Sequence, residues 1–287
     1  MGGGVASCLA ANGHRLHWVA AGRSADTRRR ATSAGAVAHD SLERGVEALV
    51  AGDGPVFVLS ICPPDNALEI ATAVAAAAAA SDRPERIVFV DGNAVAPVTM
   101  RAAAAVVAKA TAGQVDVVDG GIVGPPPRPV EPGRPASTRL FLAGSRATEV
   151  AALFEGSSLG TVVLQDADLG SASALKMVYA AWSKGSAALM LEVAAAASAH
   201  GVQDALFAEW EVSKPSLLGQ VQRAAAVSGP KAWRWKGEME EVAATFAEKG
   251  LPAGMPLGAA EVFRRLREFK DQSPPPSLDE AVAQLLS

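Results

Sequence analysis

The feature that most constrains the fold is a change of pattern along the chain. In the first half, short runs rich in β-branched residues alternate with alanine-rich segments of helical length, which is typical of a parallel sheet covered by helices on both faces. Strands are predicted at residues 15–19, 36–38, 56–60, 86–90, 114–118, 138–143 and 161–165. Helices are predicted at residues 6–12, 25–34, 42–51, 66–80 and 97–110, and the proline-dense segment 125–135 is predicted to be irregular.

Strand signals end near residue 170, and the rest of the chain is predicted to be helical. Residues 171–200 are expected to form one helix of about thirty residues, near ~45 Å long, which suits a connection between domains. Further helices are predicted at residues 206–210, 217–228, 232–249, 258–270 and 278–286. We therefore expect a Rossmann-type α/β domain over residues 1–169 and an all-α domain over residues 170–287.

Composition favours small-molecule chemistry. The 26 Lys and Arg against 30 Asp and Glu give a net charge of -4, which provides no basic field for nucleic acid or for an anionic membrane. Cys8 and Cys62 have neither disulfide-framework nor zinc-site spacing, and a secretory signal is not recognisable. We expect a cytoplasmic protein without a metal ion that binds a small-molecule substrate and neither nucleic acid nor membrane.

The first residues are typical of a dinucleotide-binding turn. Gly2, Gly4 and Ser7 fit a G-x-G-x-x-small pattern that leads into a helix, whose N-terminal amides and dipole attract a pyrophosphate. The pattern alone is weak, and an arbitrary glycine-rich start is the alternative. On this interpretation the cofactor contacts are Gly2, Gly4, Val5 and Ala6.

The turn after the first predicted strand strengthens that interpretation. It carries Arg23 and Ser24, and Arg28 follows one helical turn later. An NAD-preferring site places an acidic residue at this strand end, whereas arginine there accommodates a 2′-phosphate. We therefore expect NADP(H) in preference to NAD(H). The alternative is that these arginines, with Arg29 and Arg30, form a solvated helix face.

One strand of the dinucleotide fold has no counterpart in this sequence. Only Met1 precedes the glycines, where the central strand of the order 3-2-1-4-5-6 belongs. Its omission leaves the edges of two neighbours unpaired, roughly five backbone pairs at about 1 kcal/mol each. We expect that the natural protein begins upstream of Met1, and that this chain binds the cofactor poorly if it does not.

Other segments occur in an order and spacing that resemble a known family. These are residues 59–64, 91–94 with Pro97, 119–125 and 170–176. Together with the glycine and arginine segments they resemble the β-hydroxyacid dehydrogenases, which include 6-phosphogluconate and 3-hydroxyisobutyrate dehydrogenases. The resemblance is greatest to the branch whose C-terminal helical domain is of uncharacterised function. It implies a homodimer formed through the helical domain.

The resemblance also implies roles for particular residues. Lys176, in a G-x-x-x-x-x-K pattern starting at Gly170, would accept a proton from the substrate hydroxyl as hydride leaves. Such a base needs a pKa of about 7–8, lowered by burial or by a neighbouring cation. The alternative is a surface or ion-paired helix lysine, as we expect for Lys184. Implied substrate contacts are Gly121, Ile122, Val123, Gly124 and Tyr179, and implied cofactor contacts are Cys62, Pro63 and Asn93, the last of which could instead cap a helix.

Three departures from the family pattern put a short hydroxyacid substrate in doubt. Ala180 replaces an asparagine four residues after the lysine. Val123-Gly124-Pro125 replaces a Ser-Gly-Gly that holds the substrate carboxylate, which removes a hydroxyl and one N–H donor. Gly237-Glu238-Met239 replaces Lys-Asp-Leu, so the nearest cation is Lys236.

These observations together predict an NADP(H)-dependent oxidoreductase that acts on a small hydroxy or carbonyl substrate. The active site is expected between the domains at the carboxyl ends of the strands. Two alternatives stay open. One is an imine reductase-like enzyme, against which Lys176 argues because such enzymes usually carry a different residue there. The other is a cofactor-binding or scaffold protein that has lost catalysis.

Overall fold

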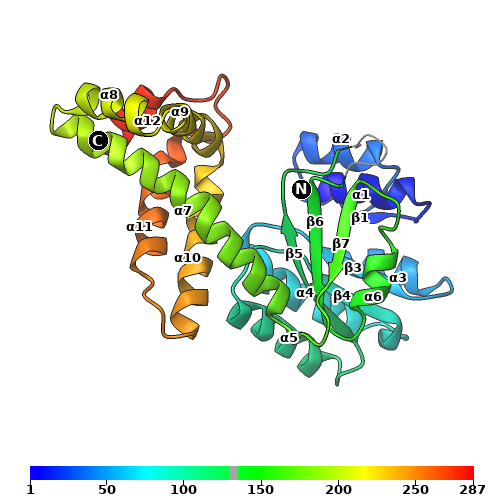
Figure 1. The fold of residues 1–287 in the computed structure, drawn as a ribbon. Coiled ribbons are helices and arrows are strands. Elements are labelled where there is room, and N and C mark those ends of the chain that lie inside the picture. Colours follow the sequence, from blue (N-terminus) through cyan, green and yellow to red (C-terminus); the bar gives the residue numbers. More distant parts are fainter. Residues whose placement is uncertain (129–134) are drawn as a thin grey trace. The chain divides into compact units, whose positions relative to one another are not determined.

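The computed structural model describes residues 1–128 and 135–287, and the chain separates into two compact units (Figure 1). The first, Met1–Lys176, contains the strands, and the second, Met177–Ser287, is helical. Helix α7 (Ser171–Ala199) runs without interruption from the first unit into the second. The predicted domain boundary after residue 169 lies just before this helix. Part of the predicted irregular segment, residues 129–134, lies outside the described residues.

The strands of the described residues form two sheets. Strands β1 (His17–Val19) and β2 (Val37–His39) make a parallel pair. The other sheet has the order β3-β4-β5-β6-β7, parallel except for the antiparallel pair β5 and β6. Its strands are β3 (Val56–Ser60), β4 (Ile87–Asp91), β5 (Asp116–Val123), β6 (Thr138–Ala143) and β7 (Leu159–Val163). The predicted α/β class is thus correct, although β5 extends five residues beyond its predicted end.

The gap between the two sheets falls where the Rossmann order places its first strand. Here β1 and β2 correspond to the second and third strands of that order, and β3 to the fourth. Over residues 1–128 and 135–287, β1 pairs with β2 and β3 with β4, and no pairing joins β1 to β3. Strands β1 and β3 therefore each have one edge without a neighbouring strand among those described, as expected from the missing strand signal before the glycines.

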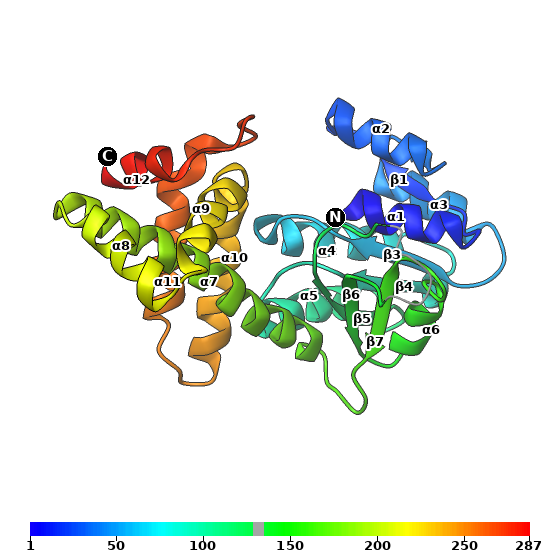
Figure 2. The same cartoon turned by 45° about the horizontal axis from the view of Figure 1, so that its top comes forward.

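Helices cover both faces of the larger sheet, and the buried side chains of β4 point alternately to the two faces. Ile87 and Phe89 face helices α3 (Leu42–Val50), α4 (Ala67–Ala79) and α5 (Pro97–Ala110). Val88 and Val90 face α1 (Gly2–Ala11) and α6 (Ala147–Ala152). Figure 2 shows α4 and α5 on the side of the sheet away from α6. Burial of both faces is typical of a parallel sheet.

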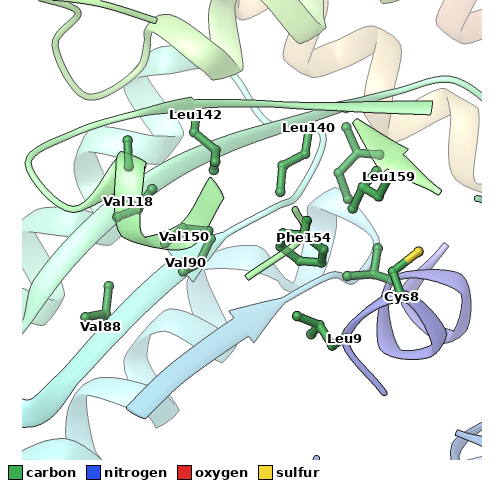
Figure 3. Close-up of a cluster of buried hydrophobic side chains, with 13 residues drawn as sticks. Cys8, Leu9, Val88, Val90, Val118, Leu140, Leu142, Val150, Phe154 and Leu159 are labelled. Carbon is green, nitrogen blue, oxygen red and sulfur yellow. The ribbon is translucent and has the colours of Figure 1, made fainter. Parts of the chain in front are cut away.

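Helix α1 contributes to the core on its face of the sheet. Cys8 and Leu9 lie in the same buried cluster as Phe154, which follows α6, and Leu159 of β7 (Figure 3). This packing holds α1 in place although no strand precedes it in the described residues. Shorter elements complete the unit: α2 (Ala25–Ser33) and the 3-10 turns Pro64–Asn66 and Pro84–Arg86.

The second unit is built from helices, as predicted. After α7 come α8 (Gln203–Ser213), α9 (Leu217–Ser228), α10 (Ala232–Glu248), α11 (Gly254–Arg265) and α12 (Leu278–Leu286), with 3-10 turns at Gly229–Lys231 and Leu266–Phe269. Helices α10 and α11 pack side by side (Figure 1). A buried ion pair between Lys184 and Glu238 joins α7 to α10, so Lys184 is ion-paired as expected.

A membrane span would need a long apolar helix, and the described parts of the chain contain none.

Candidate active site

A buried polar network lies at the carboxyl ends of β3 and β4. The Asn93 amide nitrogen donates to Ser60 Oγ at 2.9 Å and to Asp91 Oδ2 at 3.1 Å. Its amide oxygen accepts from the Cys62 N–H at 2.6 Å, and its own N–H donates to Asp91 Oδ1 at 2.9 Å. The side chain thus links two adjacent strand ends. Helix α5 has Ala96 as its N-cap, so the alternative of a capping role for Asn93 is not realised.

Burial controls the ionisation of this network. It raises the pKa of Asp91 to about 6, against the opposing effect of the hydrogen bonds from Asn93. Burial also raises the pKa of the Cys62 thiol, and Arg23 is close enough for its charge to oppose that shift. A raised thiol pKa disfavours the reactive thiolate. The hydrogen bond from the Cys62 N–H to Asn93 positions the loop around Cys62 and Pro63, and the raised pKa does not favour a nucleophilic role for the thiol.

The glycines at the start of the chain form helix, and not the turn that the motif predicted. Helix α1 begins at Gly2, four residues earlier than predicted, and the N–H groups of Gly4 and Val5 donate to the Met1 carbonyl at 2.9 and 3.2 Å. The Val5 side chain is buried in the core, while Ala6 is half-buried. Contact of Val5 with a cofactor would therefore have to come from its backbone.

The glycines nevertheless allow close packing around the start of α1. A Cβ on Gly3 would lie 3.1 Å from Arg30 Cδ, and a Cβ on Gly4 would lie 2.9 Å from Pro127 Cδ. A Cβ on Gly2 would be 3.9 Å from Ile61 Cβ. The N-terminus of α1 therefore lies beside the carboxyl end of β3 and next to an arginine of α2.

The predicted arginine site lies at the turn between β1 and α2. Arg28 Nη2 donates to the Ala20 carbonyl at 2.8 Å and its Nε to the Arg23 carbonyl at 3.3 Å. Ser24 is the N-cap of α2, and its hydroxyl accepts from the Thr27 N–H at 3.3 Å. Ser24 thus has a structural role in shaping the turn, and Arg28 holds its guanidinium at the end of β1.

Lys176 lies against the part of β5 that extends past the end of β4. A Cβ on Gly121 would lie 3.1 Å from Lys176 Cβ and 2.5 Å from the Ala172 carbonyl oxygen. On the same strand, Gly120 approaches the end of β4, where its Cβ would lie 2.9 Å from the Asp91 carbonyl oxygen. Contacts along the carboxyl ends of β4 and β5 thus connect the Asn93 network with Lys176.

The remaining predicted substrate residues lie in different surroundings. Ile122 and Val123 are buried, at 4% and 5% exposed, so their side chains are not displayed to a ligand. Gly124 has φ +117° and lies against the Ser137 carbonyl, so the backbone after β5 requires a glycine at this position. Tyr179 belongs to the helical unit and is 48% exposed on α7.

Sequence reasoning missed the importance of Asp119. The side chain is completely buried on β5 and accepts hydrogen bonds from the start of α7. It also missed Ser60 and Asp91 as partners of Asn93. The available signal was a carboxylate at the end of an otherwise apolar strand, where burial requires a partner.

The residues present fit the phosphate groups of a dinucleotide. The first N–H groups of a helix have no intrahelical acceptors and attract anions, and the start of α1 lies between Ile61 and Arg30. Arg23 and Arg28 add positive charge at the neighbouring turn. Within the described residues, no group of three or more His, Cys, Asp or Glu side chains is placed to hold a metal ion.

Comparison with known proteins gives a match to one family and to many solved structures. Residues 197–266 match a domain of unknown function, DUF1932, and no curated protein matches the chain significantly. A conserved hypothetical protein from Sinorhizobium meliloti 1021 is 26% identical, with a TM-score of 0.63 over 99% of this chain and 92% of that one.

Two further structures relate the chain to dehydrogenases. A conserved protein of unknown function, described as structurally similar to 3-hydroxyacid dehydrogenases, is 25% identical, with a TM-score of 0.59 over 93% of each chain. A 3-hydroxyisobutyrate dehydrogenase from Mycobacterium tuberculosis, 16% identical, has a TM-score of 0.62 over 100% of this chain and 96% of that one. The chain therefore has the Rossmann-like fold of the 3-hydroxyacid dehydrogenases and carries a DUF1932 domain in its helical unit.

Proposed function

We propose that this protein is an NADP(H)-dependent oxidoreductase that acts on a small hydroxy or carbonyl substrate. The observation that carries the proposal is the contact of Lys176 with Gly121 at the carboxyl end of β5. In open α/β sheets, ligands bind outside the carboxyl ends of the strands. The one lysine that matches the catalytic position of the hydroxyacid dehydrogenases therefore lies at the edge of the sheet where such a ligand binds.

Lys176 supplies the proton chemistry in this proposal. A bound nicotinamide dinucleotide supplies the hydride acceptor in oxidation and the hydride donor in reduction. The neutral amine of Lys176 takes the hydroxyl proton as the C–O bond of the substrate becomes a carbonyl. In the reverse direction its ammonium group returns the proton to the oxygen. General acid–base catalysis of this kind contributes about 10²–10⁴-fold to the rate.

Preference for NADP(H) is supported by the arginines at the turn after β1. Arg23 lies in the turn after β1, and the Arg28 guanidinium donates to the carbonyls of Ala20 and Arg23, at the strand end where an acidic residue would select the ribose diol of NAD(H). The start of α1 provides the N–H groups for the pyrophosphate. A reducing, cytoplasmic setting is part of the proposal, because Cys8 and Cys62 are both free thiols.

The substrate is proposed to be a small alcohol or carbonyl compound that does not depend on a carboxylate for binding. Val123 stands where the related dehydrogenases have a serine, and its side chain is buried. Proline at position 125 removes a backbone donor from the same segment. Both features weaken the carboxylate-binding end of the site and leave the acid–base residue in place.

Cofactor binding is the first test. Fluorescence titrations with NADPH and with NADH are expected to give tighter binding of NADPH. The exposed Arg23 is changed to Ala, and Arg44→Ala on α3, an exposed arginine paired with Glu47, serves as control. Arg23→Ala should reduce the preference for NADPH about tenfold or more, as expected for loss of a charge-assisted contact of about 1.5–3 kcal/mol. Binding of neither nucleotide, or tighter binding of NADH, contradicts the proposal.

Turnover is tested with Lys176→Met and a panel of alcohols, hydroxyacids, aldehydes, ketones and imines. We expect kcat to fall by about 10²-fold or more with unchanged NADPH affinity, while Lys109→Met, at an exposed position on α5, has no effect. Turnover of imines alone would identify an imine reductase-like enzyme. NADPH binding without turnover of any compound would favour a scaffold protein.

We further propose that two copies pair through the helical unit. Val178, Trp182 and Leu189 lie at helical spacing along one face of α7 and are 52%, 77% and 51% exposed. Gly185, between them, has open space at its Cβ position and would allow close approach of a second helix. An exposed helix face that carries large apolar side chains is typical of a protein interface.

A further inference from the structure

The first N–H groups of helix α7 are capped by a side chain on strand β5. Ala174 donates its N–H to the Gly170 carbonyl at 2.8 Å, so Gly170 occupies the N-cap position, where a side-chain oxygen normally accepts the next free N–H groups. Glycine has no such oxygen. A side chain here would also collide with α5, because a Cβ on Gly170 would lie 3.0 Å from both Pro97 Cβ and Arg101 Nη1.

Asp119 on β5 supplies the missing acceptor. Its Oδ2 accepts from the N–H groups of Gly170 at 2.9 Å and Ala172 at 2.8 Å. The Ser173 N–H lies 3.1 Å from both carboxylate oxygens, and the Ser173 hydroxyl donates to Oδ1 at 2.6 Å. Each of these partners is a donor, which favours an ionised carboxylate against the effect of burial. The negative charge also lies at the positive end of the helix dipole.

A second contact fixes the same helix one turn later. Gly121 is two residues after Asp119 on β5, so both residues face the same side of the sheet. The Cβ positions of Gly121 and Lys176 are 3.1 Å apart, so α7 lies directly on the backbone of the strand. Asp119 therefore fixes where the helix begins, and Gly121 allows the helix to lie close to β5. Lys176 is on the second turn of the segment that they hold.

We propose that Asp119 is a positioning residue that acts through the first turn of α7 to place the Lys176 amine. The inference rests on the proposed role of Lys176. It adds that this amine depends on a carboxylate 57 positions earlier in the chain, which accepts hydrogen bonds from the start of the helix. Loss of the carboxylate is expected to move the helix start and so change the surroundings of the amine.

The test measures the rate of reductive methylation of Lys176 in the full-length protein as a function of pH. For Asp119→Asn we expect the midpoint of the profile to move by about 0.5 pH unit or more, because its amide donor faces the donors of α7. Amides 172–176 should exchange with solvent about tenfold faster or more. Asp116→Asn is the control, because Asp116 is also a carboxylate on β5 but pairs with Arg146 at the start of the strand.

Superimposable methylation profiles for the Asp119→Asn variant and the natural protein would overturn the proposal, as would an equal shift in Asp116→Asn. If Asp119→Asn does not fold, Ser173→Ala decides the matter, because it removes one donor and retains the carboxylate. It is expected to shift the profile in the same direction by a smaller amount, and an unchanged profile would again count against the proposal.

These readouts separate the two claims. NADPH affinity and turnover test the function of the protein, whereas methylation of Lys176 requires neither. A protein without oxidoreductase activity but with a shifted profile in Asp119→Asn would retain the positioning role and lose the proposed function.

Discussion

Asp91 and Asp119 are two buried carboxylates in the first unit whose ionisation is affected by the fold. They are paired across β4 and β5 and are 1% and 0% exposed. Burial raises the pKa of both, and each is held by its own set of donors. The two carboxylates thus serve different elements, Asp91 the loop of Asn93 and Asp119 the start of α7.

Asp91 gives the stability of the protein a specific pH dependence. Its folded-state pKa of about 6 exceeds the ordinary value of 3.8, so between these values the folded protein retains a proton that the unfolded chain has lost. The stability from this group is therefore fully present at low pH and is lost as pH rises through about 6. Asp91→Asn removes this titration. Relative to the natural protein, the variant should gain about 2 kcal/mol of unfolding free energy between about pH 4.5 and about pH 7.5.

Urea denaturation at the two pH values measures this difference. A constant difference between the variant and the natural protein across the range would show that Asp91 titrates at its ordinary pKa when folded.

Gly124 is expected to matter for stability more than for ligand binding. Its φ is +117°, and a Cβ would lie 2.5 Å from the Ser137 carbonyl oxygen. Gly156 also has a positive φ, +74°, but its Cβ position has no neighbour within 4 Å. Thermal unfolding should show that Gly124→Ala costs about 2 kcal/mol or more, and Gly156→Ala about 1 kcal/mol. Equal losses in the two variants would remove the steric part of this explanation.

At the level of elements, the two sheets differ in burial and in the number of strand neighbours. All five residues of β4 are buried, and the strand is paired on both sides by β3 and β5. Strands β1 and β2 have three residues each, and in the described residues none of these six is fully buried. Backbone hydrogen bonds in the smaller sheet are therefore protected mainly by one another and by contact with α3.

Hydrogen exchange should reveal this difference. We expect amides 17–19 and 37–39 to exchange about a hundredfold faster or more than amides 87–91, because local opening of the short pair exposes little apolar surface. Mass spectrometry of peptic fragments resolves the two regions. Comparable protection in both would indicate that the smaller sheet opens only with the whole unit.

At the level of the whole molecule, the proposed pairing of two copies depends on the apolar face of α7. Trp182 is 77% exposed and lies at the centre of that face. Trp182→Glu should convert a dimer to a monomer in light scattering, because burial of an unpaired carboxylate opposes association. Val212→Glu is the control, at an 81% exposed position on α8. A natural protein that is monomeric at high concentration excludes the interface.

Much of the fold could be predicted because it depends on local pattern. The alternation of β-branched and alanine-rich segments located the seven strands of the described residues, and the disappearance of strand signals located the long helix α7. The boundaries were less predictable. Helix α1 begins at Gly2 although glycine has poor helix propensity and Met1 provides no side-chain cap, and burial of Val5, Cys8 and Leu9 in the core stabilises the helix.

The candidate site was predictable only where a motif carried it. Lys176 and Arg23 followed from motifs, but the partners of Asn93 did not, because Ser60, Cys62 and Asp91 come from two strands that become neighbours only in the sheet. The expected turn at Gly2 and Gly4 was wrong for a similar reason. A glycine pattern does not reveal whether the chain around it is a loop or the first turn of a helix.

The sequence by itself determined the order of the elements, the change from α/β to helical structure near residue 170, and the lysine in the position typical of an acid–base residue. The first two properties are set by side-chain periodicity within single segments. The role expected for the lysine follows from the resemblance of residues 170–176 to the hydroxyacid dehydrogenases. The tertiary structure alone decided that Asp119 caps α7 and that Gly121 touches Lys176. Each depends on contacts between segments far apart in the chain, and such contacts arise only when buried donors and acceptors find partners in the packed state.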